Sequence, residues 1–199
     1  MLVERALALD VTRLIAVAFH AFPEGHGQAQ AEVALFLDER LVGYLRERGY
    51  SAHEVDAVVA LRPERWAELP QRLAAVRAFA ALPEAPALAA ANKRVGNILK
   101  KSDTAPAAAV NPKLLVEPAE AALFAALADT APRADVAFAA GDLAASLQAL
   151  AALKAPVDAF FDAVMVNADD AALRANRLAL LAALHAAMNR VADLSRLAG

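Results

Sequence analysis

The chain has 199 residues, a formal net charge of −3 and no cysteine. The absence of cysteine excludes disulfides, thiolate nucleophiles and Cys-based zinc sites, and the acidic balance excludes a basic footprint over the whole surface. Hydrophobic residues make up 59% of the chain, and alanine, the best helix former and a poor strand former, is prominent among them. No apolar run approaches the roughly 20 residues needed to cross a bilayer, so we expect a cytoplasmic protein without membrane contact.

Apolar residues recur with helical spacing along the whole chain, and no stretch alternates like a strand. The sequence therefore predicts an all-α fold, built as a bundle of antiparallel helices. The expected helices cover 2–22, 28–48, a segment from Ser51 to just before Pro63, 64–81, 88–101, 119–130, 132–140, 142–154, 156–166 and 170–197.

Particular residues predict where several of these helices begin and end. Proline and two glycines in 23–27 end the first helix, and Gly49 is placed to end the second. Ser51 and Glu54 have the spacing of a capping box. Pro70 is expected at a kink or a junction, and Pro156 in the first turn of its helix.

Residues 102–118 are the weakest stretch for regular structure, because they contain three prolines and a turn-like beginning. A connection of this length is unusual in a compact domain, so we interpret it as a functional or mobile loop and as a candidate boundary.

The residues that usually carry catalysis are scattered, and we expect no catalytic residues and no metal site. The four histidines have no i, i+3 or i, i+4 pair, and no serine lies in a nucleophile motif. Asp158 and Asp162 lie one helical turn apart and could form a paired-carboxylate site. The structural alternative is that Asp158 stabilises a helix N-terminus while Asp162 pairs with Arg174 or Arg177.

One basic helix, residues 91–101, differs from the rest of this acidic chain. At about 100° per residue its apolar side chains fall on one face, and Lys93, Asn97, Lys100 and Lys101 fall on the opposite face with Arg94 at its edge. Such a face can contact phosphates through its cations and bases or sugars through its amides. A solvated helix face is the other interpretation, although acidic i, i+4 partners are missing. Gly96 suggests close approach by another backbone, or tight helix packing.

Several blocks closely resemble the C-terminal region of the bacterial glycyl-tRNA synthetase β-subunit family. In chain order they are AANKRVGNIL at 90–99, PAEAAL at 118–123, PVDAFFDAVMV at 156–166, LRANRLALL at 173–181 and VADLS at 191–195. The segment FLDERL at 36–41 is similar to the helical region just upstream in that family. Three positions depart from the family pattern: Asn167, Met188 and Asn189.

The resemblance implies a DALR-type anticodon-binding domain over 86–199, including the loop near 102–118, and an upstream helical region over 1–85. It also implies that the chain is a fragment with Met1 as an artificial or truncated start.

In the family, the α subunit forms glycyl-adenylate from glycine and ATP, with Mg²⁺, and glycylates tRNA(Gly), while the β subunit contributes tRNA binding. The implied partners are thus tRNA(Gly) and the α subunit, with no DNA and no membrane, and the fragment itself holds no cofactor. The alternative is a non-catalytic scaffold for subunit or interdomain contacts without RNA. The implied tRNA-contact residues are Lys93, Arg94, Asn97, Lys100 and Lys101, with Arg174 and Arg177 as a second set.

Overall fold

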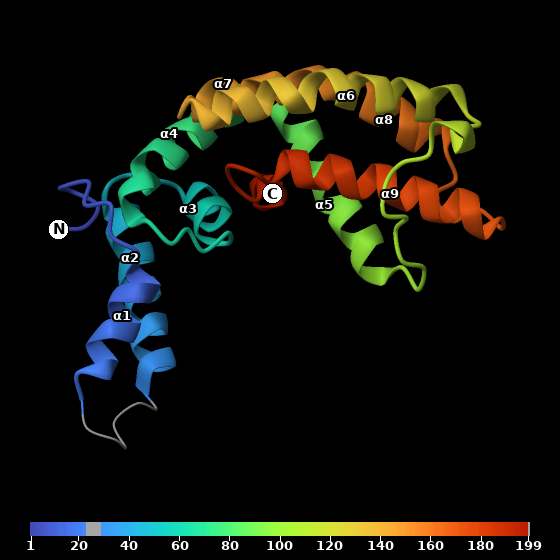
Figure 1. Ribbon diagram of the computed structural model, residues 1–199. Helices are drawn as coiled ribbons and strands as arrows, with labels where there is room; N and C mark the ends of the chain where they lie inside the picture. Colours follow the sequence, from blue (N-terminus) through green and yellow to red (C-terminus); the bar gives the residue numbers. More distant parts are fainter. Residues whose placement is uncertain (23–28, 199) are drawn as a thin grey trace.

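The computed structural model describes residues 1–22 and 29–198, and its regular structure is helical (Figure 1). Within these residues the extended backbone pairs only at an isolated bridge between Asp10 and Arg65, so the predicted all-α fold is confirmed. The α-helices are α1 (Val11–His20), α2 (Gln30–Glu47), α3 (Ala52–Val59), α4 (Leu69–Ala80), α5 (Ala85–Lys101), α6 (Pro118–Ala139), α7 (Leu143–Ala149), α8 (Lys154–Ala163) and α9 (Ala171–Met188). Short 3₁₀ helices are η2 (Trp66–Glu68), η3 (Pro112–Leu114), η4 (Leu150–Leu153) and η5 (Leu194–Leu197).

The helices from α4 onward form the main body, and α1 and α2 project from it as a hairpin (Figure 1). Helix α6 packs along α7 and α8, and these three form one layer of the body. Helix α9 lies beneath that layer and packs against α5, which crosses under it. The chain returns after α9, so that η5 packs between α3 and α5. Helix α5 is thereby held from several sides.

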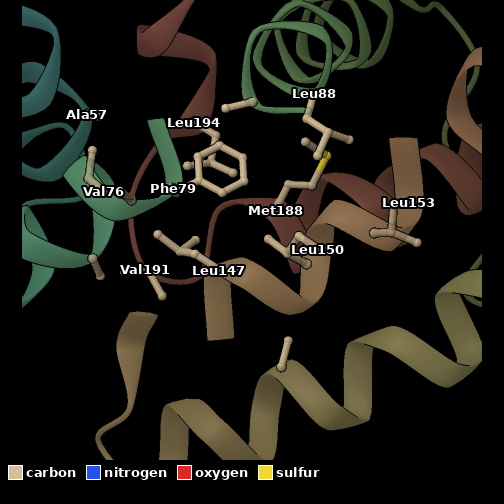
Figure 2. Packing of buried hydrophobic residues seen from close by; sticks show 14 of the residues in the cluster. Ala57, Val76, Phe79, Leu88, Leu147, Leu150, Leu153, Met188, Val191 and Leu194 are labelled. Atoms are coloured by element: carbon tan, nitrogen blue, oxygen red, sulfur yellow. The ribbon is translucent and has the colours of Figure 1, made fainter. Parts of the chain in front are cut away.

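A hydrophobic core of the described residues runs from the end of α2 through α3 and α4 into the C-terminal half of the chain (Figure 2). Phe79 of α4 is 1% exposed and lies among Leu147, Val191 and Leu194. The backbone N–H of Asp193 also donates to the carbonyl of Ala57 at 2.8 Å. Packing therefore continues across the predicted boundary at residue 85, and the division into two domains stays a prediction.

The first helix is shorter than the sequence predicted. It begins at Val11, because the Asp10 carboxylate accepts a 2.9 Å hydrogen bond from the Arg13 N–H and caps the helix. Residues before Asp10 form turns, and Ala6 has a φ of 48°. The predicted helix end at 23–27 and the predicted start at residue 28 lie outside the described residues.

Three signals near α3 and α4 are confirmed. Ser51 and Glu54 form the predicted capping box, and Gly49 has a φ of +86°, the left-handed conformation that ends helices. Pro70 stands at a junction, where η2 passes into the first turn of α4. The predicted helix from residue 64 is therefore an extended segment, a 3₁₀ turn and then α4.

The predicted break before Pro132 was wrong, since α6 runs unbroken from Pro118 to Ala139. Proline removes one backbone donor from a helix, and this loss is offset here because α6 buries residues on both sides of it, including Leu127 and Ala134. The opposite error occurred at the C-terminus, where α9 ends at Met188 and η5 is a separate turn.

Other boundaries moved by only a few residues. Helix α5 begins at Ala85 rather than 88, α8 spans Lys154–Ala163 with Pro156 in its first turn, and the segment predicted as 142–154 divides into α7 and η4. Residues 102–117 form the predicted connection and contain only η3. None of the described helices is by itself long and apolar enough to cross a membrane, and α4 and α5, which could do so only together, are bent by 110°.

Candidate nucleic-acid interface

Helix α5 separates an apolar face from a basic one, as predicted. Leu88 and Val95 are buried, at 1% and 0% exposed, against the main body. The opposite face is exposed and carries the five residues singled out from the sequence: Lys93, Arg94, Asn97, Lys100 and Lys101. Lys100 and Lys101 also lie in the last helical turn, where cations stabilise the carbonyl end of the helix. Lys93, Arg94 and Asn97 lie further from that end, so stabilisation of the helix terminus does not explain them, and they are the stronger evidence for a binding face.

A hollow of about 520 Å³ lies against this basic face. Its size is within the range of ligand-binding clefts, which is about 300–1,000 Å³. Two regions outside the helix complete its rim, namely the start of the loop that follows α5 and the turn after α8. The lining residues are Ala90, Lys93, Arg94, Asn97, Ile98, Lys101, Ser102 and Asn167.

The cations of this face have no carboxylate partners among the residues that the structure describes. The ion pairs that form within residues 1–22 and 29–198 include none of Lys93, Arg94, Lys100 or Lys101. Several other cations of the described residues do pair with carboxylates, for example Lys154, which pairs with Asp158 at 2.7 Å. The face can therefore offer its positive charge to an external anion.

Arg94 has a neighbour that the sequence did not predict. Its guanidinium carbon lies 4.1 Å from the centroid of the Phe161 ring on α8, in a cation–π contact. Phe161 in turn meets Phe160 edge-on, with ring centroids 5.5 Å apart. Phe160 is fully buried, so the core holds the aromatic platform under Arg94 in place. The two phenylalanines lie in the PVDAFFDAVMV block at 156–166, but only the packing of α8 on α5 brings them close to Arg94.

Arg174, predicted as a secondary contact, holds the rim of the hollow together. Its Nε donates to Thr104 Oγ1 at 2.9 Å, and its Nη1 donates to the carbonyl of Ala168 at 2.8 Å. Thr104 is bonded to Ser102 through the hydroxyl of Ser102, and Ala168 follows Asn167. Arg174 thus positions both loop segments that line the hollow.

Arg177 is a buried structural residue, 5% exposed. Its Nε donates to Glu120 Oε1 at 2.8 Å, and its Nη1 donates to the carbonyl of Met165 at 2.7 Å. The predicted pairing with Asp162 was wrong, because Glu120 takes that place. Because Arg177 is buried, the proposed interface does not include it.

Two further polar residues of the region serve the fold. Asn92 has 0% exposure and exchanges amide hydrogen bonds with Asn189, at 2.8 and 3.1 Å. Asn189 departs from the family pattern, and this reciprocal pair gives it a structural role at the end of α9. Gly96 faces His185 of α9 rather than another backbone.

The family profile described as DALR anticodon binding domain matches residues 88–194, which covers more than half of the chain. The chain belongs to the DALR anticodon-binding domain family. Helix α5 from residue 88 onward, the hollow, the Arg94–Phe161 contact and the rim held by Arg174 all lie within the matched residues. The DALR match begins three residues after the start of α5, so α1 to α4 precede it.

Similar proteins match along essentially the whole chain. The glycine–tRNA ligase β subunit of Thiobacillus denitrificans is 65% identical over 199 residues, and that of Delftia acidovorans is 62% identical over 198. The β subunit from Dechloromonas aromatica is 61% identical over 199 residues. The matches cover 99–100% of this chain and 28% of each relative. The DALR domain and its preceding helices thus correspond to little more than a quarter of those proteins.

Proposed function

We propose that this chain is the tRNA-binding portion of a glycine–tRNA ligase β subunit and that it binds the anticodon arm of tRNA(Gly). The observation that carries the proposal is the basic face of α5, whose cations have no carboxylate partner in the described part of the chain and border a hollow within a DALR domain. An anticodon arm presents phosphates and unpaired bases, and Lys, Arg and Asn side chains are the groups that contact them.

In this proposal the chain contributes binding and not chemistry. Glycine activation with ATP and Mg²⁺, and transfer to tRNA, take place with the α subunit of a cytoplasmic enzyme. The residues of the α5 face have the chemistry of RNA contact, and the described residues that line the hollow include no nucleophile–base pair. The alternative, a scaffold that holds subunits together without touching RNA, leaves the unpaired cations around the hollow without a role.

The salt dependence of tRNA binding distinguishes the RNA-binding proposal from the scaffold alternative. Fluorescence anisotropy with labelled tRNA(Gly) should show binding that weakens steeply as salt rises, because phosphate contacts release counterions. The double variant Lys93→Glu, Lys100→Glu should bind far more weakly and reduce the slope of log K against log salt by about 1.5, the contribution of two phosphate contacts.

A matched control changes the net charge equally at a distance from α5. The variant Arg13→Glu, Arg40→Glu places the same reversals on α1 and α2, in the projecting hairpin (Figure 1). It should bind tRNA(Gly) almost like the unmodified chain, with the loss set by long-range repulsion alone. Equal losses in both variants, or no binding at low salt by the unmodified chain, would exclude the proposed interface and favour the scaffold.

A further inference from the structure

The guanidinium of Arg94 is a flat group that lies over an aromatic ring. Phe161 lies beneath it at 4.1 Å, and Phe161 is itself packed edge-on against the buried Phe160. A planar guanidinium supported on one side by an aromatic ring has lost much of the conformational freedom that an exposed arginine normally keeps. It therefore offers a rigid surface for stacking.

Arg94 lines the hollow, whereas Phe161 does not. Arg94 thus borders the open space while its guanidinium contacts the Phe161 ring, so an occupant of the hollow can meet a guanidinium that an aromatic ring supports. Stacking on arginine planes and aromatic rings is the usual way in which proteins hold an unstacked base of single-stranded RNA.

The remaining polar groups of the hollow complement the other parts of a nucleotide. Lys93 and Lys101 provide two ammonium groups without a carboxylate partner among the described residues, which suits a phosphate. Asn97 from α5 and Asn167 from the turn after α8 provide amides on two different segments. An amide can donate and accept at once, as base edges and ribose hydroxyls require.

We infer that this hollow takes one unpaired nucleotide of an RNA loop, with its base stacked on the Phe161-backed guanidinium of Arg94. The phosphate contacts Lys93 or Lys101, and Asn97 and Asn167 hydrogen-bond the base edge or the ribose. This inference rests on the proposed function, but it makes a separate claim. A purely electrostatic face would bind paired and unpaired RNA alike, whereas a stacking platform requires a base that has left its own stack.

The test uses tRNA(Gly) transcripts that carry the fluorescent base 2-aminopurine at one anticodon-loop position at a time. Binding should change its fluorescence strongly at one loop position, because stacking alters the emission of that base. A probe in the paired stem should change little. Anisotropy of an end-labelled transcript measures total binding in the same samples.

Two variants separate stacking from charge. Arg94→Lys keeps the charge but removes the plane, and Phe161→Leu keeps an apolar contact but removes the ring. Each should weaken tRNA(Gly) binding about tenfold, the range for loss of one stacked base, and abolish the position-specific signal. The salt slope should stay nearly unchanged in Arg94→Lys, because the positive charge remains.

Arg40→Lys is the matched control. Arg40 lies over the Phe36 ring at 5.1 Å on α2, so this substitution removes a similar cation–π contact far from the hollow. It should change neither affinity nor the 2-aminopurine signal. Thermal unfolding of each variant shows whether Phe161→Leu loses stacking or loses its fold. If Phe161→Leu unfolds, the test rests on Arg94→Lys, because Arg94 is exposed and its substitution should leave the fold intact.

The outcomes distinguish this inference from the proposed function. If the unmodified chain binds tRNA(Gly) with a steep salt dependence but Arg94→Lys binds equally well, with no position-specific signal, the stacking site is excluded and the RNA-binding function stands. If the unmodified chain does not bind tRNA(Gly) at low salt, both are overturned.

Discussion

The carboxylate of Glu120 and the guanidinium of Arg177 form an ion pair in which 0% and 6% of the two side chains are exposed, with Oε1 and Nε 2.8 Å apart. The pair joins the first turn of α6 to α9, and Glu120 Oε2 also accepts from the N–H of Glu117 at 2.8 Å. Arg177 adds a hydrogen bond to Met165 in the turn beside the hollow. One buried pair thus connects a helix start, a long helix and the rim of the candidate site.

Glu120→Gln should destabilise the fold strongly, because it leaves the Arg177 charge buried without its partner. Removing one member of a buried pair typically costs about 3–5 kcal/mol in the free energy of unfolding. Urea unfolding followed by circular dichroism measures the loss. Asp129→Asn, which breaks an exposed pair with Arg133 on the same helix, should cost less than about 1 kcal/mol. Similar costs for the two variants would contradict the structural role assigned to Glu120.

Asn176 holds the loop after α5 through the backbone of Asn111. Its Oδ1 accepts from the Asn111 N–H at 2.7 Å and its Nδ2 donates to the Asn111 carbonyl at 3.2 Å. Asn176→Ala should cost about 2 kcal/mol and speed hydrogen exchange across residues 105–115, since the buried Asn176 loses both of these partly buried hydrogen bonds.

Asn111→Ala provides a matched comparison for that prediction. It keeps the backbone atoms that Asn176 binds and removes only an exposed side-chain cap on the Lys113 N–H. The loop should stay protected from exchange in this variant. Faster exchange in Asn111→Ala than in Asn176→Ala would show that the loop is held in another way.

Gly96→Ala should stabilise the chain despite the contact of α5 with α9. A methyl group at Gly96 would lie 3.4 Å from His185 Nε2, an ordinary van der Waals distance, and alanine favours a helix over glycine by about 1 kcal/mol. Gly43→Ala on α2, where nothing lies within 4 Å, should give a similar gain. The larger Gly96→Val should destabilise, because its branches must displace the imidazole. Destabilisation by alanine itself would show that α5 and α9 need the bare backbone, as the sequence first suggested.

The free energy of unfolding should decrease as the pH is lowered, because Glu54 becomes protonated. Arg77 donates to both carboxylate oxygens, at 2.6 and 2.9 Å, and these bonds, together with hydrogen bonds from Ser51, lower the pKa of Glu54 from 4.5 to about 2. Because the pKa is lower in the folded state, the stabilisation is complete above about pH 4.5 and is lost as the pH falls towards 2.

Glu54→Gln tests this pH dependence. It should cost about 1 kcal/mol at neutral pH, a modest value because Arg77 is half-exposed, and progressively less in acid. Asp56→Asn, on the same helix but in an exposed pair at 3.8 Å, should cost less than Glu54→Gln at neutral pH. Urea unfolding across that pH range provides the measurement, and a constant Glu54→Gln difference would refute the assignment.

The sequence predicted the helical fold and the basic face because both depend on neighbours along the chain. The spacing of Leu88 and Val95 sets the buried face of α5. Helical periodicity then places Lys93 and Asn97 on the opposite face, whatever the rest of the protein packs against that helix. The capping box of Ser51 and Glu54 is equally local. Errors arose where distant packing overrode a local signal, as at Pro132, which α6 tolerates because Thr130 and Ala134 are buried on either side of it.

What only the tertiary structure decided is which charged and polar side chains are available to a ligand. Arg174, Arg177 and Asn92 look in the sequence like Arg94 and Asn97, yet contacts from distant segments take their hydrogen-bonding groups into the fold. The same packing places Phe161 under Arg94 and Asn167 at the rim of the hollow. Local periodicity determines the side of a helix on which a group stands, but burial and partnering depend on residues far along the chain, and these separate a binding residue from a structural one.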